Sequence, residues 1–269
     1  MDQSAAKPSI LESRQGPVAI ITFNKAKESR NAFDLEMRGA MARAIFNARD
    51  DDSVRAVILT GSEGVFCAGG DLKALQADKA RAYTNRRRIQ RLHPWFRELS
   101  NMEKPVIAAV DGPAYGAGFN LALGCDFILA TPRARFCAVF GRIGLVPDLA
   151  GFYLLPRMVG LQRAKEIVFS ARELKVEEAD RLGLIYAIHP VEKLLDEAIA
   201  LALSFCEAST EAIGMAKNIL NRSFNLDQDT LAELESYAQA VAMDSEYHDD
   251  AVRRFVGKQP LRFLGKNRP

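Results

Sequence analysis

Short apolar runs, many of them rich in β-branched residues, alternate with segments of helical periodicity along the chain up to Pro190. The runs predict buried strands over residues 17–23, 54–60, 106–110, 127–130 and 184–188. The periodic segments predict helices over residues 35–49, 82–99, 117–124, 161–169 and 176–182. Asp34 is the expected N-cap of the first helix, and Pro94 is expected to kink or break the second. This alternation indicates an α/β fold.

The pattern changes after Pro190. Residues 192–256 have helical character without a strong strand signal, and a break is expected near residues 223–227. We therefore expect a core of residues 1–200, which holds the active site, and a helical oligomerisation region of residues 201–269.

Composition narrows the classes of protein to consider. A chain of 269 residues buries a large core without disulfides or metal ions, and a net charge of +2 gives no sign of a nucleic-acid partner. The four cysteines form no C-x-x-C pair or zinc-ligand cluster, so we expect inert thiols and no metal site. No signal-peptide pattern and no apolar run of about 18 residues is present, which predicts a cytoplasmic protein without a membrane span.

Two loops each follow a buried strand, pass through small residues and open a helix. They are residues 68–71 (AGGD) and residues 116–119 (GAGF). The first N–H groups of such a helix have no backbone partner, and glycine allows a ligand to approach closely. A matched pair of these donors suits a single oxyanion. The alternative is that the glycines serve only tight turns.

Other catalytic motifs do not fit the chain. Leu121 stands where a dinucleotide fingerprint needs a third small residue, and no Walker A motif is present. None of the histidines, His93, His189 and His248, lies in a Gly-x-Ser-x-Gly setting, and each is interpreted as a surface or packing residue.

Several motifs, in order, span nearly the whole chain. They are PVAIITFN followed by RNA, then VFCAGGDL, KPVIAAVDGPAYGAGFNLALGCDFILA, GLVPD, LLPRMVG and FVGKQPLRF. With these motifs the chain resembles the crotonase superfamily, also called the enoyl-CoA hydratase/isomerase family.

The resemblance implies a crotonase-like spiral of ββα units with a C-terminal helical trimerisation region. It also implies a homotrimer or a dimer of trimers, and an acyl-CoA thioester substrate that carries the only coenzyme. The N–H groups of Gly70 and Ala117 correspond to the oxyanion hole that stabilises a thioester enolate in this family.

The acid and base residues of the family differ here. Asn120 and Phe140 stand at the positions of the two hydratase glutamates, and Asp148 is the one carboxylate left at a catalytic position. A single base can move a proton between two carbons, so isomerisation of a double bond or ring is the leading hypothesis. The alternative for Asp148 itself is a helix N-cap. Hydration, thioester hydrolysis or C–C lysis on the same fold, and a non-catalytic acyl-CoA binder or RNA-associated scaffold, remain open.

The resemblance also implies residues that bind the substrate. Lys27, Arg30 and Ala68 are expected near coenzyme A, and Phe255 and Lys258 are expected to contribute from the tail, across a subunit interface. The remaining expected contacts are Asp71, Leu72, Asn120 and Phe140. Bulky side chains after Asp148 are expected to narrow the acyl pocket; these are Leu149, Phe152 and Tyr153.

Charged residues elsewhere are given structural interpretations. Asp71 suits the first turn of a helix, and Asp126 is expected to bind nearby backbone. The arginines of residues 86–91 indicate a solvated helix face, with a phosphate-binding lid as the alternative.

Overall fold

Two sheets organise the chain in the computed structural model, which describes residues 7–77 and 80–265. The large sheet has the order β1-β2-β3-β4-β6-β9 and the small sheet the order β5-β7-β8. The large sheet comprises β1 (Ile10–Gln15), β2 (Val18–Phe23), β3 (Ala56–Gly61), β4 (Val106–Val110), β6 (Phe127–Ala130) and β9 (Ala187–Ile188). The small sheet comprises β5 (Pro113–Tyr115), β7 (Arg135–Cys137) and β8 (Glu173–Lys175).

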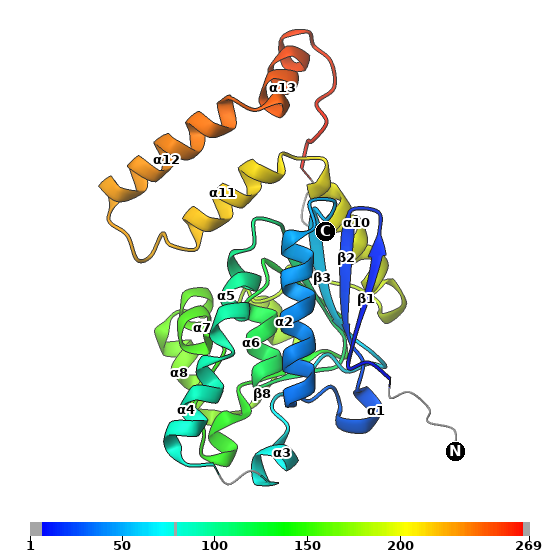
Figure 1. Cartoon of the computed structure of the whole chain (residues 1–269), viewed down its shortest axis with the longest axis vertical. Coiled ribbons are helices and arrows are strands. Elements are labelled where there is room, and N and C mark those ends of the chain that lie inside the picture. The colour runs from blue at the N-terminus through cyan, green and yellow to red at the C-terminus, as the bar shows by residue number, and fades with distance from the viewer. Residues whose placement is uncertain (1–6, 78–79, 266–269) are drawn as a thin grey trace.

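Helices cover both faces of the large sheet (Figure 1). Before β9 they are α1 (Ala26–Ser29), α2 (Leu35–Asp50), α3 (Leu72–Ala77), α4 (Ala82–Gln90), α5 (His93–Asn101), α6 (Ala117–Leu123), the 3₁₀ helix η1 (Val139–Ile143), α7 (Gly151–Val159), α8 (Leu161–Ser170) and α9 (Val176–Arg181). After β9 they are the 3₁₀ helix η2 (Val191–Lys193), α10 (Leu194–Cys206), α11 (Thr210–Leu220), α12 (Gln228–Met243) and α13 (Glu246–Val256).

Alternate residues of the central strands enter two separate hydrophobic cores. In β3, Val57 and Leu59 face the core shared with α2, α5 and α6, whereas Ala56 and Ile58 face the core shared with α10. Strands covered on both faces are apolar throughout, which explains the short apolar runs in the sequence.

Most sequence-predicted elements are confirmed, and one strand differs in extent. Asp34 caps α2 by accepting a hydrogen bond from the Met37 N–H, and the expected helix over residues 82–99 breaks into α4 and α5. The strand expected over residues 184–188 is wrong in extent, because only Ala187 and Ile188 pair with β6. Leu184 and Ile185 are buried without pairing, so their apolar character reports burial rather than a strand.

The fold repeats a strand–strand–helix unit. In one unit β4 joins the large sheet, β5 joins the small sheet and α6 follows; in the next, β6 and β7 do the same before η1. The preceding unit follows this plan in shortened form, since β3 leads to a bridge between Cys67 and Ala114 and then to α3. Neighbouring units therefore place the segments that open α3 and α6 side by side.

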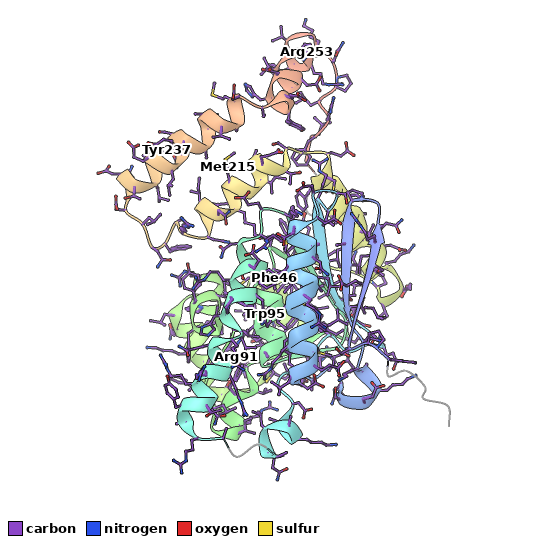
Figure 2. All side chains as sticks on the ribbon, viewed as in Figure 1. Phe46, Arg91, Trp95, Met215, Tyr237 and Arg253 are labelled. Carbon is purple, nitrogen blue, oxygen red and sulfur yellow. The ribbon has the colours of Figure 1, made fainter. Side chains whose placement is uncertain are left out.

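An ion pair anchors the C-terminal helices to the core. The Lys217 ammonium on α11 lies 2.8 Å from Asp126 Oδ2, which also accepts a hydrogen bond from the Val106 N–H. This contact confirms that Asp126 binds nearby backbone. Beyond α11, α12 and α13 have no buried residue, and Figure 2 shows Tyr237 and Arg253 on them, away from the sheets.

In the described part of the chain, no single helix has the length and apolarity needed to cross a membrane. Residues Val191–Cys206 and Thr210–Leu220 reach that composition only as a pair, and the pair is bent by 104°. The apolar side chains of α10 pack against the large sheet.

Candidate active site

Glycines allow the two predicted loops to pack directly against each other. A Cβ atom at Gly69, where φ is +97°, would lie 2.9 Å from the Tyr115 carbonyl oxygen. A Cβ atom at Gly118 would lie 2.3 Å from the Cys67 carbonyl oxygen. Both distances are too short for any larger residue. These glycines therefore do more than form tight turns, because they bring the opening of α6 against the segment that leads to α3.

The donors predicted for an oxyanion lie on these loops. Ala117 is the first residue of α6, and Gly70 comes two residues before α3. A Cβ atom at Gly69 would lie 3.7 Å from the Ala117 nitrogen, which shows how closely the loops approach. Within the described residues, neither the Gly70 nor the Ala117 N–H donates a hydrogen bond. Both groups are therefore available to a ligand, as an oxyanion hole requires.

A buried asparagine holds the loop before α2 against the first of these loops. Asn31 has a φ of +56°, its Oδ1 accepts a hydrogen bond from the Lys25 N–H at 2.7 Å, and its Nδ2 donates to the Val65 carbonyl at 2.7 Å. The Ala68 N–H donates to the Arg30 carbonyl at 3.1 Å. Arg30 and Ala68, two of the residues expected near coenzyme A, are thereby adjacent.

The expected substrate contacts outside the cavity fall into two groups, one around α1 and α3 and one at α13. Lys27 is exposed and pairs with Glu63 at 3.1 Å, and Leu72 is exposed at the start of α3. Asp71 Oδ1 accepts hydrogen bonds from the N–H groups of Lys73 and Ala74 in the first turn of that helix. Phe255 and Lys258 lie at or just after α13, at the far end of the molecule from α3 and α4 (Figure 1). Within one chain they do not join the other residues.

The backbone of Asp148 is fixed from two sides. Its carbonyl oxygen accepts hydrogen bonds from Asn120 Nδ2 at 2.8 Å and from the Gly151 N–H at 2.9 Å. A Cβ atom at Gly151 would lie 2.5 Å from Asn120 Nδ2, so this close approach requires glycine. Leu149 and Ala150 both have positive φ, a costly conformation for residues other than glycine. Asn120 thus positions the Asp148 loop.

One oxygen of the half-buried Asp148 carboxyl group lacks a partner. Its Oδ1 is inaccessible and makes no hydrogen bond. Helix α7 begins at Gly151 with no side-chain cap, so the N-cap interpretation of Asp148 is wrong. Burial raises the pKa of Asp148, and the positive charge of Arg38, followed by a hydrogen bond from the backbone of Asp148, opposes that rise. A carboxyl group with a raised pKa can both accept and return a proton.

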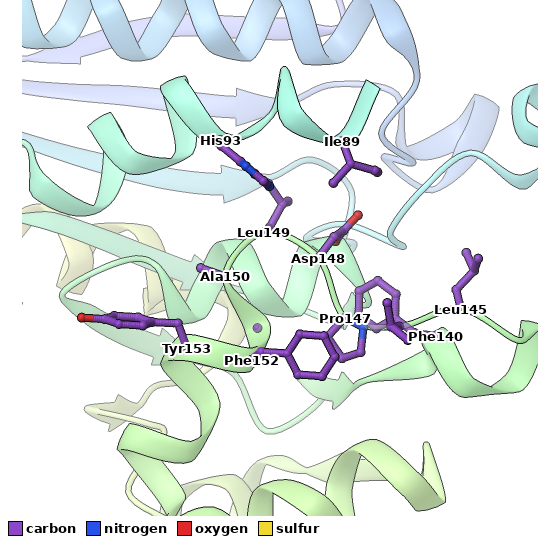
Figure 3. Close-up of a pocket in the computed structure, with 12 residues that line it drawn as sticks. Ile89, His93, Phe140, Leu145, Pro147, Asp148, Leu149, Ala150, Phe152 and Tyr153 are labelled. Atoms are coloured by element: carbon purple, nitrogen blue, oxygen red, sulfur yellow. The ribbon is translucent and has the colours of Figure 1, made fainter. Parts of the chain in front are cut away.

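Asp148 lies in the wall of a cavity of about 390 Å³ (Figure 3). Its lining is mostly apolar and consists of Ile89, His93, Phe140, Leu145, Val146, Pro147, Asp148, Leu149, Ala150, Gly151, Phe152 and Tyr153. The Phe140 ring also approaches the second loop, since a Cβ atom at Gly116 would lie 3.7 Å from its Cζ. The bulky residues expected to narrow the pocket, Leu149, Phe152 and Tyr153, do line it. The Tyr153 hydroxyl, however, lies within 2.9 Å of the Asn221 carbonyl.

His93 is exposed, which agrees with its interpretation as a surface histidine. It also lines the cavity together with Asp148. Figure 3 shows the two side chains on the same side of the cavity, at the start of α5 and before α7. The sequence offers only a weak sign that His93 belongs to the cavity. His93 and Ile89 both line it, and they are four residues apart, on either side of the break between α4 and α5.

Metal chemistry has no visible ligand set here. Within the described residues, no group of three or more His, Cys, Asp or Glu side chains is placed to hold a metal ion. The four cysteines are buried and unpaired, as expected for inert thiols. The polar groups that the structure places at the two loops and in the cavity wall include backbone N–H groups, the Asp148 carboxyl group and the His93 imidazole.

Comparison with known proteins identifies the family. The model of the family described as enoyl-CoA hydratase/isomerase matches residues 13–266. This chain belongs to the enoyl-CoA hydratase/isomerase family. A family member from Escherichia coli K12, 1,2-epoxyphenylacetyl-CoA isomerase, is 34% identical, over 96% of this chain and 98% of its own. The short-chain-enoyl-CoA hydratase of Clostridium acetobutylicum is 32% identical, with the same coverage of both chains.

A solved structure supports the same assignment at the level of the fold. The enoyl-CoA hydratase/isomerase of Cupriavidus metallidurans CH34 superposes with a TM-score of 0.91 at 41% identity, over 97% of this chain and 98% of that one. The expected crotonase fold and its C-terminal helical region are thereby confirmed. The relatives include both isomerases and hydratases, so family membership alone leaves the reaction open.

Proposed function

We propose that this family member is an acyl-CoA isomerase in which Asp148 transfers the proton. Asp148 removes a proton next to the thioester or two carbons beyond it. The electron pair of the broken C–H bond moves to the thioester oxygen and gives a dienolate, which the N–H groups of Gly70 and Ala117 stabilise. Asp148 then returns the proton to the other carbon. Coenzyme A enters with the substrate, and no separate cofactor takes part.

The observation that carries this proposal is the state of Asp148. Its Oδ1 is buried and lacks a hydrogen bond. Asp148 lines a mostly apolar cavity and is the one carboxyl group among the described residues that line it. Hydration by the two-glutamate route needs two carboxyl groups, and this chain lacks both glutamates. Asn120 and Phe140 stand at the two positions where the family resemblance places them. Losing one donor of an oxyanion hole costs about 3–4 kcal/mol of barrier, so both loops are needed.

Product analysis tests the proposal. The protein is incubated with 3-enoyl-CoA, 2-enoyl-CoA and ring-epoxide acyl-CoA thioesters, and the products are separated by mass and retention time. We expect products of unchanged mass with a shifted double bond or an opened ring. Products heavier by one water would contradict isomerisation.

Hydration is the second candidate, and His93 is the observation that favours it. The imidazole lines the same cavity as Asp148, so a water held between them has both an acid and a base available. The hydratase relative from Clostridium acetobutylicum agrees with this alternative. A 3-hydroxyacyl product that disappears in a His93→Gln variant would establish hydration. Tight acyl-CoA binding without turnover across the panel would instead indicate a non-catalytic binder.

We further propose a homotrimer or a dimer of trimers. Helices α12 and α13 bury no residue within the chain yet carry large exposed apolar side chains, among them Tyr237, Val241, Phe255 and Val256. A second chain that covers this surface can bring Phe255 and Lys258 to a neighbouring active site. Light scattering after size-exclusion chromatography measures the mass, and a monomer would contradict this proposal.

A further inference from the structure

Tyr153 on α7 joins the cavity wall to the connection between α11 and α12, residues 221–227. Its hydroxyl oxygen lies 2.9 Å from the Asn221 carbonyl oxygen and 2.8 Å from Asn225 Oδ1. Both acceptors belong to the C-terminal helical region, whereas the other residues that line the cavity lie between Ile89 and Phe152. The C-terminal region therefore contacts the cavity wall through Tyr153.

Arg157, one turn further along α7, holds Tyr153 from a second direction. Its guanidinium carbon lies 3.5 Å from the centroid of the Tyr153 ring, where the ring quadrupole attracts a cation. Its Nη1 donates a hydrogen bond to the Tyr153 carbonyl at 2.8 Å, and its Nη2 donates to Asn225 Oδ1 at 3.2 Å. The ring is thus held at its hydroxyl and at one face, and Asn225 Oδ1 accepts hydrogen bonds from both side chains.

Tyr153 lies at the end of the cavity away from the oxyanion loops. Phe140 marks the end next to those loops, because a Cβ atom at Gly116 would lie 3.7 Å from its Cζ. Figure 3 shows Asp148 between Phe140 and Tyr153, with the Tyr153 hydroxyl directed away from Asp148. An acyl group with its thioester oxygen at Ala117 and its reacting carbons at Asp148 therefore directs its far end towards Tyr153.

We propose that Tyr153 limits the length of the acyl group, and that Asn225 is a positioning residue that keeps the Tyr153 ring at the far end of the cavity. This inference rests on the proposed function and narrows its substrates to thioesters of short acyl groups. A longer chain needs the space that the ring occupies, and the ring cannot swing aside without leaving both Asn225 and Arg157. One methylene group in an apolar pocket changes kcat/KM by about 10–200-fold.

Steady-state kinetics with 3-hexenoyl-CoA and 3-dodecenoyl-CoA test the role of Tyr153, and the readout is the ratio of the two kcat/KM values. Wild type should prefer the hexenoyl substrate by at least about tenfold. Tyr153→Ala removes the ring and should reduce this preference at least about tenfold, chiefly through a lower KM for the dodecenoyl substrate. Should Tyr153→Ala not fold, Tyr153→Leu also removes the ring, keeps an apolar side chain on α7 and makes the same comparison.

The role of Asn225 is tested by variants that remove or keep its acceptor. Asn225→Ala and Tyr153→Phe lose the same hydrogen bond, so both should shift the ratio in the direction of Tyr153→Ala by about two- to tenfold, the range of one neutral hydrogen bond. Asn225→Asp keeps an oxygen acceptor beside Arg157 and should restore the wild-type ratio. Ser223→Ala is the control, because the Ser223 hydroxyl on the same connection donates to the Leu220 carbonyl, and it should match wild type.

The outcomes separate a failure of this inference from a failure of the proposed function. If wild type isomerises neither substrate, the proposed function fails, and the dissociation constants of hexanoyl-CoA and dodecanoyl-CoA then test Tyr153 in the same variants. If wild type accepts both lengths equally, or Tyr153→Ala keeps the wild-type ratio, the role of Tyr153 is refuted. A wild-type ratio in Asn225→Ala refutes the role of Asn225.

Discussion

Replacing Asp148 by asparagine is expected to stabilise the protein while it abolishes proton transfer. Burial raises the pKa of Asp148, so the folded state holds this proton more tightly than the unfolded chain does. As the pH rises above the unfolded value of about 3.9, the unfolded chain ionises first and the free energy of unfolding falls. The cost is complete once the pH exceeds the folded pKa. Asparagine does not titrate and avoids this cost.

The structure sets the size of the effect. A buried acceptor without a partner costs about 1–3 kcal/mol, and more when it is charged. The positive charge of Arg38 offsets part of that cost. We therefore expect Asp148→Asn to raise the free energy of unfolding by about 1 kcal/mol at pH 8, or about 2–4 °C in Tm for a chain of this size.

Urea unfolding and thermal unfolding at matched protein concentration, from pH 4 to pH 8, measure this difference. It should be largest at pH 8 and shrink towards pH 4. Asp71→Asn is the control, because asparagine caps a helix nearly as well as aspartate, and it should stay within about 0.5 kcal/mol of wild type. An Asp148→Asn variant that is less stable than wild type at pH 8, or a gain that does not vary with pH, would refute the reasoning.

Three other substitutions probe the framework of the site. Gly118→Ala places a Cβ 2.3 Å from the Cys67 carbonyl and should cut kcat at least tenfold as the loops separate, which steady-state kinetics measures. Lys217→Met leaves Asp126 buried without its cation and should lower the free energy of unfolding by about 3 kcal/mol in urea titrations, a loss that the added change Asp126→Asn should largely recover. Asp34→Ala removes the cap of α2 and should cost about 1 kcal/mol by the same titrations, with little change in KM.

The features that the sequence predicted well depend on local chemistry. Asp34 caps its helix because a carboxylate accepts a hydrogen bond from the third N–H, a rule that needs no tertiary structure. The loops around Gly70 and Ala117 are recognisable in the sequence because two strand-to-helix loops made of small residues are unusual in one chain. The central strands were recognised because burial on both faces leaves an apolar run.

The features that the sequence did not predict depend on packing between distant segments. Strand β1 has one buried residue and lies at the sheet edge, so it shows no apolar alternation. His93 is an exposed polar position on a helix, and only the fold places it in the cavity wall with Asp148. Likewise, Asn120 was expected to contact substrate, whereas its amide holds the Asp148 carbonyl.

The central claim is that Asp148 moves a substrate proton to and from carbon. Deuterium uptake by an acyl-CoA substrate in deuterated water, followed by mass spectrometry with wild type and Asp148→Asn at equal concentration, tests it most directly. The account predicts uptake at the α or γ carbon with wild type and a loss of at least a hundredfold in the rate with the variant, on the order of the upper contribution of general acid–base catalysis. Equal uptake with both proteins would contradict it.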